Sequence, residues 1–362
     1  MVPNNIRVIK AIVAVTLLSI SGWTAMTMDL KEIVAQQQPF IESGIIEWTS
    51  GSVPIIDHFF PIEIFNRIWR GTMATFSPST LGYDEVALWQ IFSFLIDLGP
   101  LYTIFLLESF RPANTLSPAY FNSSPTIFTC LAQFSGIGIV APFFLFLCLV
   151  FGPGAHDLAK FPPSSRTVRH NDIWTLLSVV LLLHTVEVFV MFLATDLTTR
   201  HYWTWAWQAS PLWIGIAVTV SSSITKDRIS GAGSFASLRS LLVILGAIST
   251  AFWLFTLTSS PFPIATVFLP RVEVQSDFVF HTRKALQADE VGTILAAFLW
   301  LIFSFYNLHI AGLLDDKWLL YSITLPVATI FAGPGTALII GWYLKEITLK
   351  ANSIPKISYR RS

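Results

Sequence analysis

Long apolar runs separated by short polar segments dominate the sequence. A membrane-spanning helix needs about 20 mostly apolar residues. Eight runs meet that length: residues 8–26, 86–107, 126–151, 173–195, 202–222, 238–258, 291–313 and 318–344. The first run has the basic start of a secretory signal, which would leave seven spans, but no small-residue cleavage site follows it. The pattern therefore predicts an all-α, polytopic transmembrane helix bundle of about eight spans.

The longest stretch between predicted spans, residues 27–85, is expected to be a loop. Within it, residues 53–70 mix apolar and polar side chains, and Pro54 and Pro61 exclude one straight helix. We interpret 53–70 as an amphipathic segment lying in the membrane interface, with an ordinary loop as the alternative. Because no internal repeat is visible, we expect one membrane domain over residues 1–362, ending in a basic tail at 346–362.

Composition supports this class of protein. Charged residues make up 12% of the chain, against about 25% in soluble domains. Lys and Arg number 22, as do Asp and Glu, so there is no basic surface for nucleic acid. We expect the lipid bilayer as the surroundings and no nucleic-acid partner.

Several ionisable residues lie inside the predicted spans. A charge near the centre of a membrane helix costs about 2.5–3.5 kcal/mol on insertion scales, so such residues usually face a protein interior or a cavity. Asp97 lies in mid-span just before Pro100, which bends the helix. Glu108 follows on nearly the same face, about 16 Å further along the axis. The alternatives are a hydrogen bond from Asp97 to a neighbouring helix and an ion pair between Glu108 and Arg111.

Two further groups of polar residues stand out. His184 and Glu187 are adjacent on one helical face, and apolar surroundings favour a neutral carboxyl that can donate a proton. A His–Glu hydrogen bond that joins two helices is the alternative. Tyr306, Asn307 and His309 lie within about one turn. They are candidates to line one cavity with His184 and Glu187, although a contact between helices is the favoured interpretation.

Expected absences narrow the function. Paired Glu-x-x-His motifs mark di-iron bundles, and this chain has one reversed His-x-x-Glu without a second copy. Asp315 and Asp316 lack the further aspartate of magnesium-diphosphate motifs, and we find no glycine-rich phosphate loop. We therefore expect no metal and no cofactor.

The stretch LIDLGPLYTIFLLESFRPAN resembles a fungal family of membrane terpene cyclases. These are cyclases of the ascochlorin and ascofuranone type and the related paxilline-cluster membrane protein. The family carries Glu-Ser-x-Arg-x-x-Asn at the end of an early span, which here is Glu108, Ser109, Arg111 and Asn114. The proline-rich end of the family's next span is matched by residues 141–153.

The resemblance implies a membrane-bound, metal-independent terpene cyclase of fungal meroterpenoid or indole-diterpene biosynthesis. Such an enzyme is a multi-pass protein, expected in the endoplasmic reticulum, with other membrane enzymes of its pathway as further partners. Its substrate would be a prenylated, epoxidised small molecule. A carboxyl protonates the terminal epoxide as general acid, and a dry pocket protects the cation from water.

On this scheme we expect Asp97 or Glu187 to donate the proton, with His184 orienting Glu187. Glu108 and Arg111 would form a supporting or substrate-contacting pair.

The remaining candidates are assigned to the substrate. Asn114, Tyr306 and Asn307 would bind it, and His309 would remove the final proton.

A small-molecule transporter or a receptor-like membrane protein is the competing interpretation. It would use Asp97, His184 and Glu187 as a proton relay or ligand site. The inverted repeats common in transporters are not visible in the sequence. A scaffold for other pathway enzymes is a third possibility.

Overall fold

The computed structural model describes residues 4–56, 58–114, 117, 120, 124–168, 173–225 and 235–351. Helices predominate there, so the all-α prediction is confirmed. A small antiparallel hairpin of β1 (Ile45–Trp48) and β2 (Gly51–Pro54) is the one sheet in these ranges. Most of the predicted basic tail, from 352 onward, lies outside the described residues.

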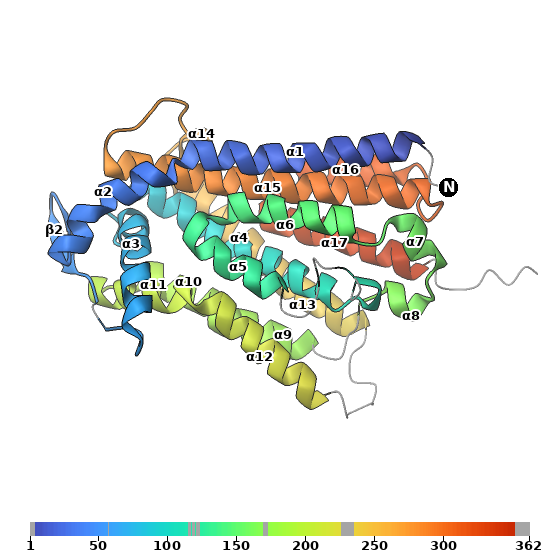
Figure 1. Cartoon of the computed structure of the whole chain (residues 1–362), viewed down its shortest axis with the longest axis horizontal. Coiled ribbons are helices and arrows are strands. Elements are labelled where there is room, and N and C mark those ends of the chain that lie inside the picture. Colours follow the sequence, from blue (N-terminus) through green and yellow to red (C-terminus); the bar gives the residue numbers. More distant parts are fainter. Residues whose placement is uncertain are drawn as a thin grey trace, which may run out of the picture.

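The long helices run along the longest axis of the molecule (Figure 1). Helices α1 (Asn4–Met28), α6 (Ile137–Phe151) and α15 (Phe278–Ile310) pack together. Helix α4 (Glu85–Ser109) packs against α13 (Phe235–Ser259) and α17 (Pro334–Ala351). The start of α1 lies at the same end of the bundle as α7 (Ala155–Lys160) and α8 (Pro163–Arg166).

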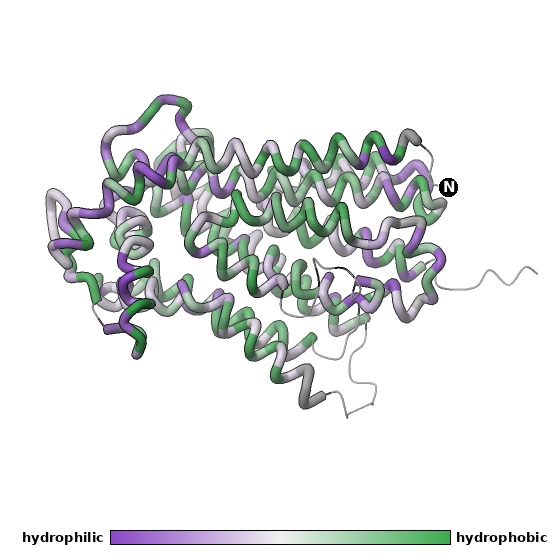
Figure 2. The backbone as a smooth tube through the Cα atoms, viewed as in Figure 1, coloured by the Kyte–Doolittle hydropathy of each residue, from purple (hydrophilic) through white to green (hydrophobic). Residues whose placement is uncertain are grey.

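Hydrophobic residues fill most of the length of these helices, and hydrophilic segments gather toward the two ends (Figure 2). Within the described ranges, five helical segments are long and apolar enough to cross a membrane: Ile6–Ser43, Glu85–Ser109, Ile173–Leu193, Phe235–Ser259 and Phe278–Ile310. Three shorter apolar helices accompany them: Ile137–Phe151, Ser210–Ser221 and Lys317–Ala332. The expected number of eight spans is not confirmed, because several predicted spans are broken.

The predicted span 126–151 is a helical hairpin, and the prediction of one continuous helix is wrong. Helix α5 (Ser124–Ser135) ends at Gly136, where α6 begins in the opposite direction. Gly136 has φ +88°, a backbone conformation open to glycine. The rings of Phe128 and Phe144, on the two arms, have centroids 5.0 Å apart.

The predicted span 318–344 is also a hairpin rather than one helix. Helix α16 (Lys317–Ala332) ends at Gly333, which has φ +86°, and α17 returns. Leu325 of α16 faces Gly341 of α17, where an added Cβ would collide with it. Both hairpins therefore turn at a glycine that begins a Gly-x-Gly sequence, 136–138 and 333–335.

The other predicted spans deviate less. The span predicted at 173–195 consists of α9 (Ile173–Val180), a π-helical turn η3 (Leu181–Thr185) and α10 (Val186–Leu193). The span predicted at 202–222 is divided between α11 (Leu197–Gln208) and α12 (Ser210–Thr225), next to Pro211, which cannot continue the helical hydrogen bonds. Helix α15 begins at Phe278, well before the expected 291.

Residues 27–85 are not the loop that we expected. They form α2 (Leu30–Ser43), the β hairpin and α3 (Glu63–Thr80). Both helices contain many polar residues, so they were not recognised as apolar runs. The segment 53–70 becomes helical only at Glu63, because Asn66 bonds the backbone N–H and carbonyl of Phe60 (2.8 and 2.9 Å) and fixes an irregular entry. Its interfacial placement stays a prediction. The remaining short elements are η1 (Pro112–Asn114) and α14 (Ile264–Phe268).

Candidate functional site

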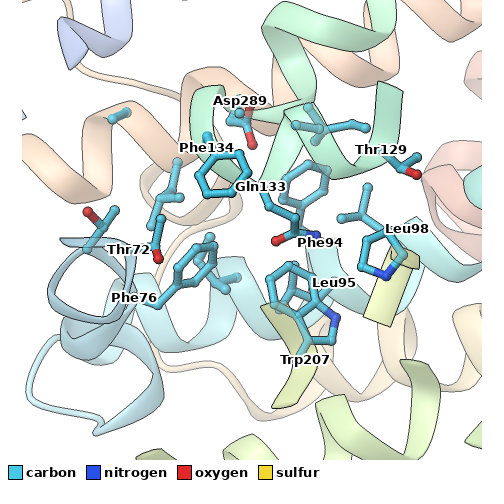
Figure 3. A pocket seen from close by; sticks show the side chains of 18 of the residues that line it. Thr72, Phe76, Phe94, Leu95, Leu98, Thr129, Gln133, Phe134, Trp207 and Asp289 are labelled. Atoms are coloured by element: carbon cyan, nitrogen blue, oxygen red, sulfur yellow. The ribbon is translucent and has the colours of Figure 1, made fainter. Parts of the chain in front are cut away.

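An apolar chamber of about 230 Å³ lies between α2, α3, α4, α5, η3, the junction of α11 and α12, and α15 (Figure 3). It is larger than the ~150 Å³ apolar cavities that bind benzene in other proteins. Aromatic rings supply much of its wall: Phe76, Phe94, Tyr102, Phe105, Phe134 and Trp207. This chamber, defined by these rings and the residues between them, is suited to a hydrocarbon ligand.

Asp289 is the one carboxylic acid among the described residues that line the chamber. Figure 3 places it at the wall near Phe134. Its Oδ1 accepts the backbone N–H of Gly138 at 2.6 Å, in the first turn of α6. The first N–H groups of a helix have no partner within the helix, and their end of the helix dipole favours an anion or a carboxyl acceptor. Asp289 therefore caps α6 with one oxygen.

Glycine at 138 makes this cap possible. An added Cβ there would collide with the backbone of Asp289 itself. The hairpin turn thus approaches α15 more closely than any residue with a side chain allows. The tip of the α5–α6 hairpin is fixed by Asp289 and at the same time forms part of the chamber wall through Gly136 and Ile137.

His184 also lines the chamber, from the π-helical turn η3. Its Nδ1 lies 3.2 Å from Trp207 Nε1, and its Nε2 lies 2.8 Å from the Leu95 carbonyl oxygen. An indole N–H only donates and a carbonyl only accepts, so Nδ1 accepts and Nε2 carries the proton. Both ring nitrogens are occupied, so the expectation that His184 orients Glu187 is wrong.

Asp97 faces away from the chamber. Its Oδ1 accepts the hydroxyl of Ser249 on α13 at 2.6 Å, and the Asp97 carboxyl also accepts the backbone N–H of Gly335, at the start of α17. Gly99, on the opposite side of α4, packs against the ring of His184. Asp97 and His184 therefore lie on opposite sides of one helix. The chamber that His184 lines therefore does not include Asp97, one of the two expected proton donors.

The same arrangement, an aspartate that caps the returning helix of a hairpin, thus occurs twice in the described residues. Each Gly-x-Gly hairpin is fixed by an aspartate of another helix that accepts an N–H at the start of the returning arm. Asp289 does this for α6 and Asp97 for α17. Only the first of the two lines the chamber.

Glu187 is buried on α10, with 6% of its surface exposed. Its Oε2 has no hydrogen-bond partner within the described part of the chain. It is not among the residues that line the chamber.

Glu108 forms the expected pair with Arg111 (3.0 Å), within a larger cluster. Its two oxygens accept from Nε and Nη2 of Arg111 and from Asn114, Trp342 and Lys345, at 2.7–3.3 Å. Arg111 also pairs with Glu346 at 2.8 Å. A carboxylate with this many donors, two of them cations, has no proton to give. The cluster ties the end of α4 to α17.

This charged cluster borders a second cavity, of about 560 Å³. The cavity is partly lined by α7, at the opposite end of the bundle from α2 and α3 (Figure 1). Arg111, Asn114 and Asn307, three of the expected substrate-binding residues, line it with Glu108 and Lys345.

The other two residues of the Asn307 group lie elsewhere. Tyr306 packs its ring against Trp318, with centroids 5.3 Å apart, and the His309 ring lies 6.0 Å from the same tryptophan. His309 Nδ1 is 3.2 Å from the carbonyl oxygens of Leu314 and Asp315. Neither residue lines either cavity.

The sequence patterns did not point to Asp289, Lys345 or Glu346. Asp289 precedes the expected start of its span at 291, and the two others follow the expected end at 344. Glycine pairs inside apolar runs are a signal of a broken helix. The Gly-x-Gly sequences at 136–138 and 333–335 therefore marked where each span breaks, but not that the chain reverses there.

Comparison with known proteins gives three fungal relatives. The chain is 26% identical over 314 residues to the FAD-dependent monooxygenase verC1 of Penicillium polonicum (84% of this chain, 38% of the relative). It is 26% identical over 308 residues to the FAD-dependent monooxygenase anuJ of Penicillium roqueforti (82% and 36%). It is 27% identical over 291 residues to the FAD-dependent monooxygenase BOA8 of Botryotinia fuckeliana (77% and 36%). The matched part is little more than a third of each relative, and no solved structure matches the chain.

The flavin in these names does not fit the described residues. Residues 136–141 spell Gly-x-Gly-x-x-Ala, but a dinucleotide fingerprint joins a strand to a helix in a parallel sheet. Here the sequence joins two helices, and the sheet of the described ranges is the antiparallel β1–β2 pair. The carboxyl of Asp289 lies at the helix start where a pyrophosphate would bind.

The family comparison covers most of the chain. The CtvD domain matches residues 41–349, from the last turn of α2 to the last turn of α17. None of the three relatives is named a cyclase, so the comparisons do not show the expected terpene cyclase activity. The chain belongs to the CtvD domain family.

Proposed function

We propose that this chain is a multi-pass membrane enzyme, of the endoplasmic reticulum, that opens a terminal epoxide of a prenylated substrate and cyclises the resulting cation. The reaction is assigned to the apolar chamber, with Asp289 as proton donor. The observation that carries the proposal is that Asp289 is the one acid among the described residues of an aromatic-walled apolar cavity. An apolar cavity with a few convergent polar groups, here including Asp289 and His184, is the general form of a small-molecule site.

The chemistry follows from the two oxygens of Asp289. Oδ1 is anchored by Gly138, so the carboxyl is held in place while the other oxygen carries the proton. General acid catalysis transfers this proton to the epoxide oxygen. The carbon–oxygen bond then breaks toward a tertiary cation, and an alkene or a carbonyl oxygen of the substrate attacks it.

The chamber supplies the remaining requirements. Aromatic faces stabilise a nearby cation by about 0.5–2 kcal/mol each, most when water is absent, and an apolar wall excludes water that would quench it. The Asp289 carboxylate takes back a proton when the product forms, so the reaction is a net isomerisation. His309, which we expected to be the final base, lies outside the chamber.

The relatives support this reaction class indirectly. A flavin monooxygenase adds one oxygen atom to its substrate, and an alkene gives an epoxide. The unmatched part of the relatives is the natural place for that activity. A segment joined to such an enzyme, and similar to this chain, is well placed to consume the epoxide. A membrane-associated monooxygenase is therefore the pathway partner that we propose.

The test compares two aspartate variants in nanodiscs supplied with an epoxyfarnesyl phenol. Asp289→Asn keeps an acceptor for Gly138 but removes the acid, so we expect kcat to fall at least 100-fold. Asp97→Asn is the matched control, because Asp97 caps the other hairpin without lining the chamber. We expect it to stay within twofold of wild type. Undiminished turnover by Asp289→Asn would overturn the proposal.

A small-molecule transporter is the second candidate function. Helices that break within a predicted span, as they do at Gly136 and Gly333, are typical of transporter binding sites. Purified protein in sealed vesicles separates the two functions. Uptake of the epoxide without chemical change would favour transport, and conversion without uptake favours the cyclase.

A further inference from the structure

The chamber has a mouth at the protein surface. Among its lining residues, three are exposed: Val34 (59%), Ile68 (47%) and Phe134 (43%). They come from three different helices, α2, α3 and α5. All three side chains are apolar. The mouth is defined by these three residues.

Apolar surface continues outward from the mouth on two helices. Ile64 is exposed one turn before Ile68 on α3, at 60%. Leu131 and Ile127 are exposed on the same face of α5, at 51% and 57%, leading away from Phe134. Exposed apolar patches of this kind mark contacts with protein, membrane or ligand rather than with water.

Contacts between helices bound the mouth. On one side the rings of Trp69 and Phe134, from α3 and α5, have centroids 4.8 Å apart. On the other, the side-chain amide of Gln37 donates to the hydroxyl of Thr75, between α2 and α3. The opening therefore lies where α2, α3 and α5 meet, and its position is fixed by packing.

The charged residues of α3, Glu63, Arg67 and Arg70, are not among the described residues that line the chamber. Glu63 and Arg67 pair with each other at 3.6 Å, while Ile68, Gly71 and Thr75 line the chamber. Ile68 is the residue that α3 contributes to the mouth, and the nearby polar groups of Gln37 and Thr75 bond to each other, so the mouth favours an apolar ligand over a charged one.

We propose that the chamber opens sideways into the lipid, through the mouth formed by Val34, Ile68 and Phe134. The ligand class is an amphiphile dissolved in the bilayer, whose hydrocarbon tail enters the chamber while its polar head stays at the membrane surface. A tail that enters this way never crosses water, so its apolar groups are not rehydrated. The proposal rests on the proposed function for the identity of the occupant, but the route can be measured without catalysis.

The first experiment tests where the mouth lies. Phe134→Cys is spin-labelled in nanodiscs of phosphatidylcholine, with Cys130 and Cys148 replaced by alanine. Relaxation by oxygen, which concentrates in lipid, is compared with relaxation by a water-soluble nickel complex. Val272→Cys is the control, on an exposed loop between Arg271 and Glu273. We expect the label at 134 to favour oxygen at least fivefold more than the label at 272. Equal preference at both positions would overturn the lateral route.

The second experiment tests whether ligands use the mouth. A photoreactive farnesyl benzophenone ether is added to the lipid, and its labelling of chamber peptides is measured. Ile68→Trp fills the mouth and should reduce labelling at least fivefold. Ile64→Trp places the same bulk one turn away on α3 and should leave labelling within 1.5-fold. Unchanged labelling in Ile68→Trp would refute the proposal.

These readouts separate the route from the chemistry. Asp289→Asn should label like wild type although it does not turn over. If Asp289→Asn loses turnover and Ile68→Trp keeps full labelling, the proposed function stands and the lateral route is refuted. If Ile68→Trp loses labelling and Asp289→Asn keeps full turnover, the lateral route stands and the proposed function is refuted.

Discussion

Replacing Glu108 by glutamine tests the energetics of the buried charged cluster. Glu108 has 3% of its side chain exposed, and it pairs with both Arg111 and Lys345. Glutamine keeps one oxygen to accept from the Trp342 indole but carries no charge. Arg111 retains its second partner, Glu346.

The expected loss is large because Lys345 loses its carboxylate. Removing one partner of a buried ion pair costs about 3–5 kcal/mol. The ring of Trp300 lies 4.5 Å from the Lys345 ammonium, and a cation–π contact in a dry site offsets up to about 2 kcal/mol. We therefore expect Glu108→Gln to lower the free energy of unfolding by about 2–4 kcal/mol.

Unfolding in mixed micelles titrated with SDS, followed by circular dichroism, measures this difference. Glu42→Gln is the control, because Glu42 is an exposed glutamate bonded only to Gln38, and its effect should stay within about 0.5 kcal/mol. The double variant Glu108→Gln/Lys345→Met removes both charges and should regain more than half of the loss. If Glu108→Gln unfolds at the same midpoint as Glu42→Gln, the reasoning is refuted.

Three further perturbations follow from the structure. Gly136→Ala forces a side chain into a φ of +88° and against the Asp289 carboxyl, so the free energy of unfolding in the SDS titration should fall by about 1–3 kcal/mol; an unchanged midpoint would contradict the tight turn. Burial lowers the pKa of His201 to about 4, below about 6.5 in the unfolded chain. The contribution of His201 to the free energy of unfolding is therefore fully present above about pH 6.5 and decreases as pH falls toward 4, by up to about 1.4 kcal/mol per pH unit. His201→Gln should reduce this pH dependence in thermal melts. Trp207→Phe removes the donor to His184 Nδ1 and should cost about 0.5–1.5 kcal/mol, measured by the same titration; no change would show that this bond is not formed.

Local patterns predicted the features that depend on neighbours along the chain. Glu108 and Arg111 are three residues apart, so their pairing follows from helical geometry. Asp97 and Glu108 were expected on one face of their helix, and both contact α17, through Gly335 and Lys345.

Polar helices were harder to recognise than apolar ones. Helices α2 and α3 bury Gln37 and Asn66 through specific hydrogen bonds, so their buried faces are not marked by hydrophobicity. A search for apolar runs therefore interpreted this part of the chain as a loop.

The sequence by itself determined the helical class, the apolar lengths of the helices and the contacts within a single helix, because these depend on residues a turn apart. Only the tertiary structure decided that two apolar runs reverse at Gly136 and Gly333. It also decided which acid meets the chamber. Asp289 reaches the N–H of Gly138 from a helix far away in the sequence, and Asp97 points to the other hairpin. Which side of a buried helix faces a cavity depends on how the helix packs against helices distant in sequence. The spacing of apolar residues along one helix does not determine this orientation.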